Sequence, residues 1–370
     1  MTILEYVIDQ KDVSFAERPF HDVDNTVLAE LAYVDYDGIF YDEAENQNGL
    51  PLAEVSRRFF ATHDAEEIEK NAKFCDRAPL LLREMAKGER YRDMLFSHYV
   101  NEVNEADEED ATQFSALAFH LSEDTWYVAY RGTDASFTGW KESLLMSYLE
   151  ETGGCKEAVA YLDHLGKEHP GKLIVGGHSK GGYFAMYASI FCAPDVQDRI
   201  TIVYNNDGPG MHEEIIFSSE YQNIRPRMMN IVPDSSIIGQ LLFNQGEHKV
   251  VKSEAQGIFQ HDAFTWVIEG TEFAETKLTP FSLFVQAALG NWLDTVDRES
   301  RASIIDTVFS VLEATGSESF TELHEERLKS AHAVLSGLVS LPEDKRKELL
   351  GAFAAFIKSN QKAAIQSLLP

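Results

Sequence analysis

One stretch, residues 173–186, constrains the fold more than any other part of the chain. A short apolar run leads into a glycine-rich segment at 176–182, and small, helix-forming residues follow. The pattern Gly177-x-Ser179-x-Gly181 between a strand and a helix is typical of a nucleophile elbow, in which a serine occupies a very sharp turn. The glycines leave space where bulkier side chains would clash. The alternative interpretation is a plain strand-to-helix turn that carries no chemistry.

Strand and helix patterns alternate on both sides of this turn. Apolar and β-branched runs predict strands at 114–119, 126–130, 173–177, 200–204, 228–232 and 248–251, and helical spacing predicts helices over 20–34, 140–150 and 155–168. Residues 35–110 have a mostly helical pattern. This order predicts an α/β fold with a mainly parallel sheet flanked by helices, and the first two strands form an antiparallel hairpin.

The pattern changes after Gly270. From residue 280 to the end the sequence is amphipathic and helical, without a competing strand signal. We therefore predict a core over residues 1–274 with a helical N-terminal segment, and a helical C-terminal appendage or cap over 275–370.

Charge and cysteine content limit the partners. The net charge of −29 disfavours nucleic acids and anionic membranes, because both repel such a surface. The three cysteines are far apart and predict neither a disulfide framework nor a zinc site. The first residues do not form a signal peptide and no apolar run is long enough to span a bilayer, so the expected location is the cytoplasm.

A serine hydroxyl needs a base and an orienting carboxylate to act as a nucleophile, and in the elbow arrangement these follow the serine as acid and then histidine. His261 follows a loop after the last predicted strand and is the predicted base, although an exposed or capping histidine is the alternative. Asp234 follows the strand at 228–232 and is the preferred acid, because the penultimate strand usually supplies it. Asp207, after the strand at 200–204, is the alternative acid or a turn residue.

An oxyanion formed at Ser179 needs two hydrogen-bond donors. The backbone N–H of Lys180 is the first, since it follows the nucleophile directly. Thr133 ends an earlier strand and is expected to supply the second through its amide or hydroxyl.

Three motifs together resemble the lipase class 3 group of α/β-hydrolases: the segment at 130–134 with Trp140, the segment at 177–182, and the pair Val232-Pro233. Within that group the chain looks like a bacterial lipase-like family classed as a domain of unknown function, on the segments at 20–25, 206–210 and 257–262. The resemblance covers roughly residues 14 to 268.

The resemblance implies an α/β-hydrolase-like core, Ser179 as nucleophile, His261 as base, Thr133 as an oxyanion residue and no cofactor or metal. Class 3 lipases carry their acid two residues before the Val-Pro pair, where this chain has Asn230. The predicted function is a lipase-like or esterase-like serine hydrolase that cleaves a carboxylic ester of a small molecule or lipid through a Ser-His-Asp triad and an acyl-enzyme. The alternative is a hydrolase fold used as a binding or scaffolding module.

Overall fold

The computed structural model describes residues 1–72, 74–104, 112–133 and 151–313, and the short segments 341–343, 345–347 and 350–351. The predicted helix over 140–150 and most of the tail beyond 313 lie outside the described residues. The chain divides into two compact units. The first comprises residues 1–132, 151–239 and 243–278, and the second comprises 133–150, 240–242 and 279–370.

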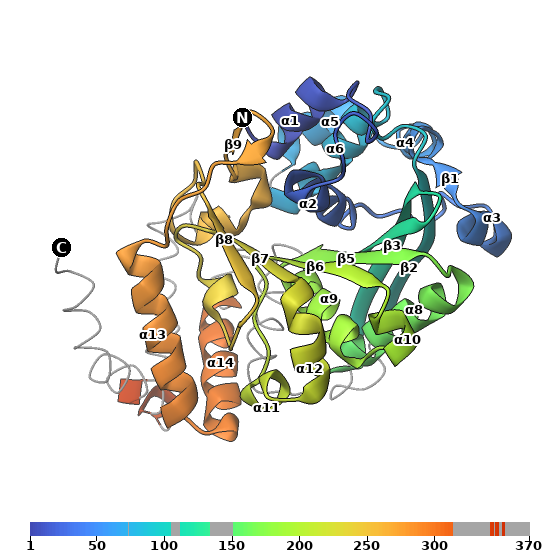
Figure 1. The fold of residues 1–370 in the computed structure, drawn as a ribbon. Helices are drawn as coiled ribbons and strands as arrows, with labels where there is room; N and C mark the ends of the chain where they lie inside the picture. The colour runs from blue at the N-terminus through green and yellow to red at the C-terminus, as the bar shows by residue number, and fades with distance from the viewer. Residues whose placement is uncertain are drawn as a thin grey trace. The chain divides into compact units, whose positions relative to one another are not determined.

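The first unit is built on an eight-stranded sheet whose strands lie side by side in chain order (Figure 1). The strands are β1 (Leu50–Pro51), β2 (Leu95–Asn104), β3 (Thr112–Ser122), β4 (Thr125–Tyr130), β5 (Lys172–His178), β6 (Ile200–Asn206), β7 (Met228–Pro233) and β8 (Glu247–Val251). Strands β1 to β4 are antiparallel, and β4 to β8 are parallel. The predicted mainly parallel sheet with an antiparallel beginning is therefore confirmed.

Helices and short strands connect these elements. The N-terminal helices are α1 (Ile3–Gln10), α2 (Asp22–Leu31), α3 (Glu43–Asn48), α4 (Leu52–Phe59), α5 (Ala65–Asn71), η1 (Phe74–Arg77) and α6 (Ala78–Met85). Later helices are α8 (Gly153–Glu168), α9 (Lys180–Phe191), α10 (Pro194–Gln197), α11 (Glu213–Ile216), α12 (Ser219–Ile224), η2 (Arg225–Arg227), η3 (Ile238–Gln240), η4 (Gly257–His261) and η5 (Ala263–Thr265). A small hairpin joins β9 (Ile268–Glu269) to β10 (Glu272–Phe273), and the second unit contains α13 (Pro280–Thr295) and α14 (Arg298–Glu313).

Helices cover both faces of the parallel sheet in the first unit. The main core lies between one face and the N-terminal helices, with Val27 and Leu28 of α2 packed among Tyr127, Ile174 and other strand residues. The opposite face packs against α8 and α9 (Figure 1). Alternate side chains of each buried strand point to opposite faces, so strands covered on both faces read as continuous apolar runs.

Strand β2 is where the sequence-based assignment is wrong, because the pattern of residues 35–110 predicts mostly helix. Its pairing with β3 shifts register between Ser97 and Val100, and His98 within that bulge has φ of 54°. An extra residue in one strand breaks the alternation of buried and exposed side chains. The period of two that identifies a strand is therefore missing from the sequence here.

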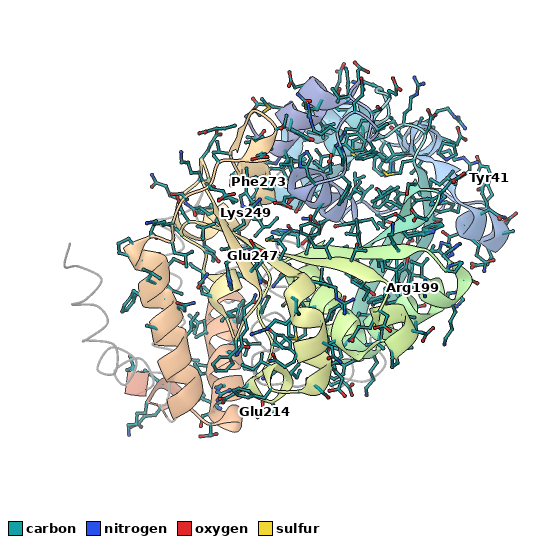
Figure 2. All side chains as sticks on the ribbon, in the orientation of Figure 1. Tyr41, Arg199, Glu214, Glu247, Lys249 and Phe273 are labelled. Atoms are coloured by element: carbon teal, nitrogen blue, oxygen red, sulfur yellow. The ribbon has the colours of Figure 1, made fainter. Side chains whose placement is uncertain are left out.

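An ion pair connects the edge strand β8 to the N-terminal helices. Lys249 of β8 binds the carboxylate of Asp22 at the start of α2 (Lys249 is labelled in Figure 2). Tyr204 of β6 donates a hydrogen bond of 3.0 Å to the other oxygen of that carboxylate. These contacts fix α2 across the carboxyl half of the parallel strands.

Candidate active site

Ser179 occupies the turn between β5 and α9. Its backbone angles, φ 58° and ψ −129°, lie in a region that side-chain-bearing residues rarely adopt, at a cost of about 1–3 kcal/mol. The hydroxyl does not cap α9, although serine is one of the residues that most often does so. The turn predicted from the sequence is therefore strained at Ser179, and the serine side chain does not cap the helix that follows.

Close packing explains the glycines on either side of Ser179. A Cβ atom at Gly181 would lie 2.0 Å from the carbonyl oxygen of Tyr130, and one at Gly177 would lie 2.3 Å from the carbonyl carbon of Gly181. Both neighbours are backbone atoms, which cannot move aside without shifting β4 or α9. The spacing of the motif thus follows from the approach of the helix to the strands.

His261 binds a buried carboxylate. Its Nδ1 lies 2.7 Å from Oδ2 of Asp207, and the Asp207 and His261 side chains are 1% and 11% exposed. Asp207 directly follows β6 with φ of 48°. Its other oxygen accepts hydrogen bonds from the hydroxyl of Ser236 and, at 3.2 Å, from the N–H of Gly239. The carboxylate is held by three donors, one of which is the imidazole.

Asp234, the acid preferred from the sequence, has a different partner. Its Oδ1 accepts a hydrogen bond of 2.9 Å from the side-chain amide of Gln260, whose Oε1 accepts from the N–H of Ser235 at 2.8 Å. Gln260 and His261 are adjacent in the 3₁₀ turn η4, so their side chains leave it in different directions. One reaches the end of β7 and the other the end of β6.

The end of η4 is fixed to its surroundings on two further sides. Trp266 donates a hydrogen bond of 2.8 Å from Nε1 to the carbonyl of Gln260. Asp262 forms an ion pair with Arg77, and burial raises the pKa of this carboxyl to about 6 in spite of the nearby guanidinium. The His261 backbone is consequently held by residues both before and after it.

His178 links Ser179 to His261 and to the N-terminal helices. Its Nε2 lies 2.8 Å from the carbonyl oxygen of His261, and the two imidazoles lie with centroids 4.7 Å apart and planes tilted by 33°. Its Nδ1 lies 3.0 Å from Oε1 of Glu30, a buried residue of α2. The same nitrogen lies 3.2 Å from the hydroxyl of Tyr33.

The pKa values of the two histidines are shifted in opposite directions. Burial disfavours the imidazolium of His178, but the Glu30 carboxylate outweighs it and raises the pKa of His178. Burial lowers the pKa of His261, and the electrostatic interaction with His178 lowers it further, while the hydrogen bond to Asp207 acts in the opposite direction. His261 is thus the more easily neutral of the pair, with Nδ1 directed to Asp207.

The predicted oxyanion residues, Lys180 and Thr133, belong to different units of the chain. Lys180 begins α9, and its buried side chain lies over the ring of Phe184 with the ammonium 5.8 Å from the centroid. A Cβ atom at Gly132 would lie 3.1 Å from Cβ of Ser179 and 2.5 Å from the carbonyl oxygen of His178. Gly132 therefore packs directly against the elbow, and the residue that follows it, Thr133, is buried.

Sequence reasoning missed the part that the N-terminal helix α2 plays here. Asn25 donates a hydrogen bond of 2.8 Å to Asn206, which in turn donates to the carbonyl of Gly177 at 2.9 Å. Glu30 and Asn25 are 1% exposed or less. Polar residues on the apolar face of the predicted helix over 20–34 were the available signal, because buried polar groups need partners.

The mainly parallel sheet flanked by helices, with a sharp turn between β5 and α9, is a fold of the α/β-hydrolase type, similar to that of class 3 lipases. The Mbeg1-like family model matches residues 85–310, so the chain belongs to that family. The matched range begins later and ends later than the resemblance at 14–268. No curated protein matches the chain.

Several solved fungal lipases are similar to part of the chain. They include the Rhizomucor miehei lipase propeptide complex, with 17% identity over 43% of this chain and 57% of that one and a TM-score of 0.33. Lipase II of Rhizopus niveus has 17% identity over 46% and 70% of the two chains, with a TM-score of 0.33. The lipase of Rhizopus microsporus var. chinensis has 14% identity over 52% and 77%, with a TM-score of 0.32.

Within the described residues, no helix has the length and apolar character needed to cross a membrane.

Proposed function

We propose that the protein is a serine hydrolase that cleaves carboxylic esters, with Ser179 as nucleophile, His261 as base and Asp207 as the orienting acid. The observation that carries the proposal is the hydrogen bond of 2.7 Å between His261 Nδ1 and buried Asp207. His261 is bound through its carbonyl to the residue that precedes the strained serine. A histidine whose Nδ1 is held by a buried carboxylate is the arrangement that orients an imidazole to activate a serine hydroxyl.

The reaction follows from these roles. His261 Nε2 takes the proton of the Ser179 hydroxyl as the oxygen attacks the ester carbonyl. The Asp207 carboxylate holds Nδ1–H and stabilises the imidazolium that forms. The N–H of Lys180, with Thr133 as the second donor, stabilises the negative oxygen of the tetrahedral intermediate. The imidazolium then protonates the departing alcohol, and water activated by the same histidine releases the acid from the acyl-enzyme.

Two further observations support this function. The lowered pKa of His261 keeps its imidazole neutral at neutral pH, which is the form that accepts a proton. The strain at Ser179 costs stability, and such strain is found mainly where function requires it. The net charge of −29 favours a neutral acyl ester, including a lipid ester, over an anionic substrate.

A fluorophosphonate probe, which reacts with activated serines, tests the assignment. We expect the native protein to be labelled, the Ser179→Ala variant to remain unlabelled, and the Ser219→Ala variant, altered at an exposed serine, to be labelled like wild type. Activated esters with short, medium and long acyl chains should be hydrolysed by wild type, and Ser179→Ala should lower kcat by about 10⁴-fold or more. Absence of labelling in the native protein, or equal labelling of Ser179→Ala, contradicts the proposal and favours the binding-module alternative.

A further inference from the structure

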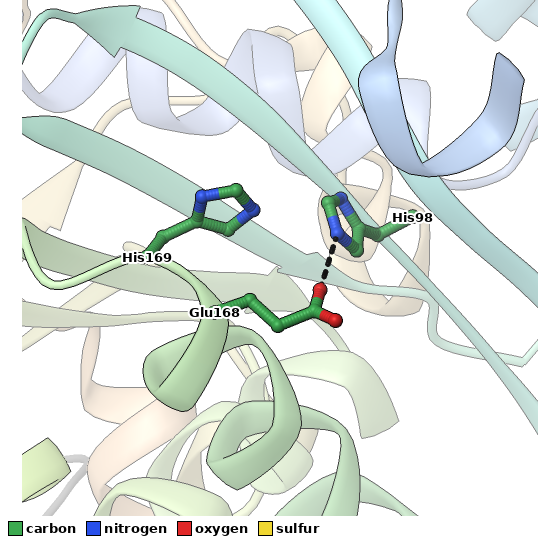
Figure 3. A group of neighbouring side chains, drawn as sticks. All are labelled: His98, Glu168 and His169. Atoms are coloured by element: carbon green, nitrogen blue, oxygen red, sulfur yellow. Dashed lines mark hydrogen bonds and ion pairs between the residues drawn. The ribbon is translucent and has the colours of Figure 1, made fainter. Parts of the chain in front are cut away.

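A second group of polar side chains lies at the end of β5 opposite to Ser179. We call it the His98 cluster: His98, Glu168 and His169 (Figure 3). Each offers one ligand atom, and these atoms all lie within 4.8 Å of one another. The residues come from the bulge in β2, the end of α8 and the turn into β5. The amino end of β5 is near them, whereas Ser179 follows its carboxyl end.

His98 is fixed by its surroundings with one ring nitrogen directed into the cluster. Its Nδ1 lies 2.8 Å from the hydroxyl of Ser97, and its Nε2 lies 3.2 Å from Oε2 of Glu168. Tyr161 donates a hydrogen bond of 2.8 Å to the His98 carbonyl, which holds the left-handed backbone in place. A hydrogen bond to one imidazole nitrogen orients the other toward a metal in many metalloproteins.

One ring nitrogen of His169 makes no hydrogen bond within the described part of the chain. Its Nε2 is buried and finds no hydrogen-bond partner among the described residues, and Figure 3 shows its ring pointing toward His98. A buried nitrogen without a partner costs free energy unless something binds it. Trp126 stacks on the ring with centroids 4.0 Å apart, so the ring cannot turn freely.

The backbone of His169 is fixed as well. Arg199, which is labelled in Figure 2, donates a hydrogen bond of 2.7 Å to the His169 carbonyl and another of 3.0 Å to that of Gly171. The N–H of His169 binds the carbonyl of Leu165 at 2.9 Å. Glu168, by contrast, is 38% exposed and has room to move toward an ion.

We propose that the His98 cluster binds a divalent transition-metal ion of the zinc type through His98, Glu168 and His169, with water in the remaining position. Two imidazoles and one carboxylate are ligands that zinc and its neighbours accept, whereas Mg²⁺ and Ca²⁺ prefer oxygen alone. Metal–ligand bonds of about 2.0–2.1 Å at tetrahedral angles place ligand atoms about 3.3 Å apart, close to the 3.2 Å between His98 Nε2 and Glu168 Oε2. The exposed Glu168 side chain can adjust to an ion without moving β2 or β5.

Bound metal would link the end of α8 to the β2 bulge. An ion that binds the folded state but not the unfolded chain stabilises the fold by mass action. The site therefore acts on stability, and it is independent of ester hydrolysis at Ser179.

Calorimetric titration of the chelator-treated full chain with Zn²⁺ tests the proposal. We expect one Zn²⁺ per chain with a Kd on the order of micromolar or tighter, a raised Tm, and no binding of Mg²⁺ or Ca²⁺ at the same concentration. Glu168→Gln and His169→Gln should each weaken zinc binding at least about 100-fold, since even indirect partners of a metal ligand are worth 10–100-fold. Binding of Co²⁺ should give visible absorption bands that both variants lose.

Two control variants separate this site from general surface binding. Glu157→Gln removes an exposed carboxylate from the same helix, and His248→Gln removes an exposed histidine from β8; both should bind Zn²⁺ like wild type. Because Glu168 is exposed, its variant should keep the wild-type circular dichroism spectrum. Failure of wild type to bind Zn²⁺, or equal binding by wild type, Glu168→Gln and His169→Gln, overturns the proposal.

Discussion

Near Ser179, some residues contact the imidazole of His261 and others hydrogen-bond to its backbone. Asp207 contacts the ring directly, and His178 contacts the carbonyl. Asp234 acts one step away, because it holds Gln260. The contact with Asp207 matters most for stability, because this carboxylate is buried and an unpaired buried charge costs several kcal/mol.

The two aspartates give a sharp test of the triad acid. We expect Asp207→Asn to lower the esterase kcat by about 10⁴-fold, because the amide no longer holds His261 in the correct tautomer. Asp234→Asn is the matched control and should retain activity within about tenfold, since an amide can still accept from Gln260. Steady-state kinetics on an activated ester measures both. A large loss in Asp234→Asn with little loss in Asp207→Asn would reverse the assignment.

At the scale of elements, the approach of α9 to β4 and β5 creates the turn at Ser179. The helix begins directly after the strained residue, and the register places Gly177 opposite Tyr130 of β4 and Asn205 of β6. Parallel strands end at one edge, so residues after β6 and β8 come to the same place as those after β5. This explains why Asp207 and His261 lie beside the elbow although they are far from it in sequence.

Packing at the elbow predicts a strong effect of one added methyl group. Gly181→Ala should destabilise the first unit by more than about 3 kcal/mol, because its Cβ would lie 2.0 Å from a backbone oxygen in a densely packed interior. Gly270→Ala is the control: its φ is 68° and nothing lies within 4 Å of the added atom, so a cost of only about 1–2 kcal/mol is expected. Urea unfolding followed by tryptophan fluorescence compares them. Equal stability of the two variants would contradict the packing argument.

On the scale of the whole molecule, residues 1–84 lie outside the family match and still contribute to the candidate site. Helix α2 brings Glu30 to His178 and Asn25 to Asn206. A buried ion pair between Asp24 and Arg90 holds this helix, and both side chains are fully buried. Arg90 also donates to the carbonyls of Val13 and Arg18. The guanidinium therefore connects α2 to the loop between α1 and α2.

Removing one partner of that pair should weaken the fold. Asp24→Ala should lower the free energy of unfolding by about 3–5 kcal/mol, because the Arg90 guanidinium would remain buried without its carboxylate. Asp93→Asn interrupts an exposed pair with Arg92 and should leave Tm nearly unchanged, since exposed pairs contribute little. Thermal unfolding followed by circular dichroism measures both. An Asp24→Ala variant as stable as wild type would show that the pair contributes no net stability.

Much of the fold follows from local sequence patterns. Apolar runs identified β3 to β8, and the glycine spacing located the turn at Ser179, because both features depend on residues that are near each other in the chain. The strand β2 was missed since its bulge removes the period of two.

What the sequence determined by itself was therefore the α/β sheet, the elbow and the loop that carries His261. The tertiary structure alone decided which aspartate meets that histidine, because Asp207 and Asp234 both follow parallel strands and only the direction of the η4 side chains distinguishes them. It also brought together Glu30 with His178 and His98 with His169, residues separated by 148 and 71 positions. Such contacts depend on strand order, register and burial, which no local pattern of residues encodes.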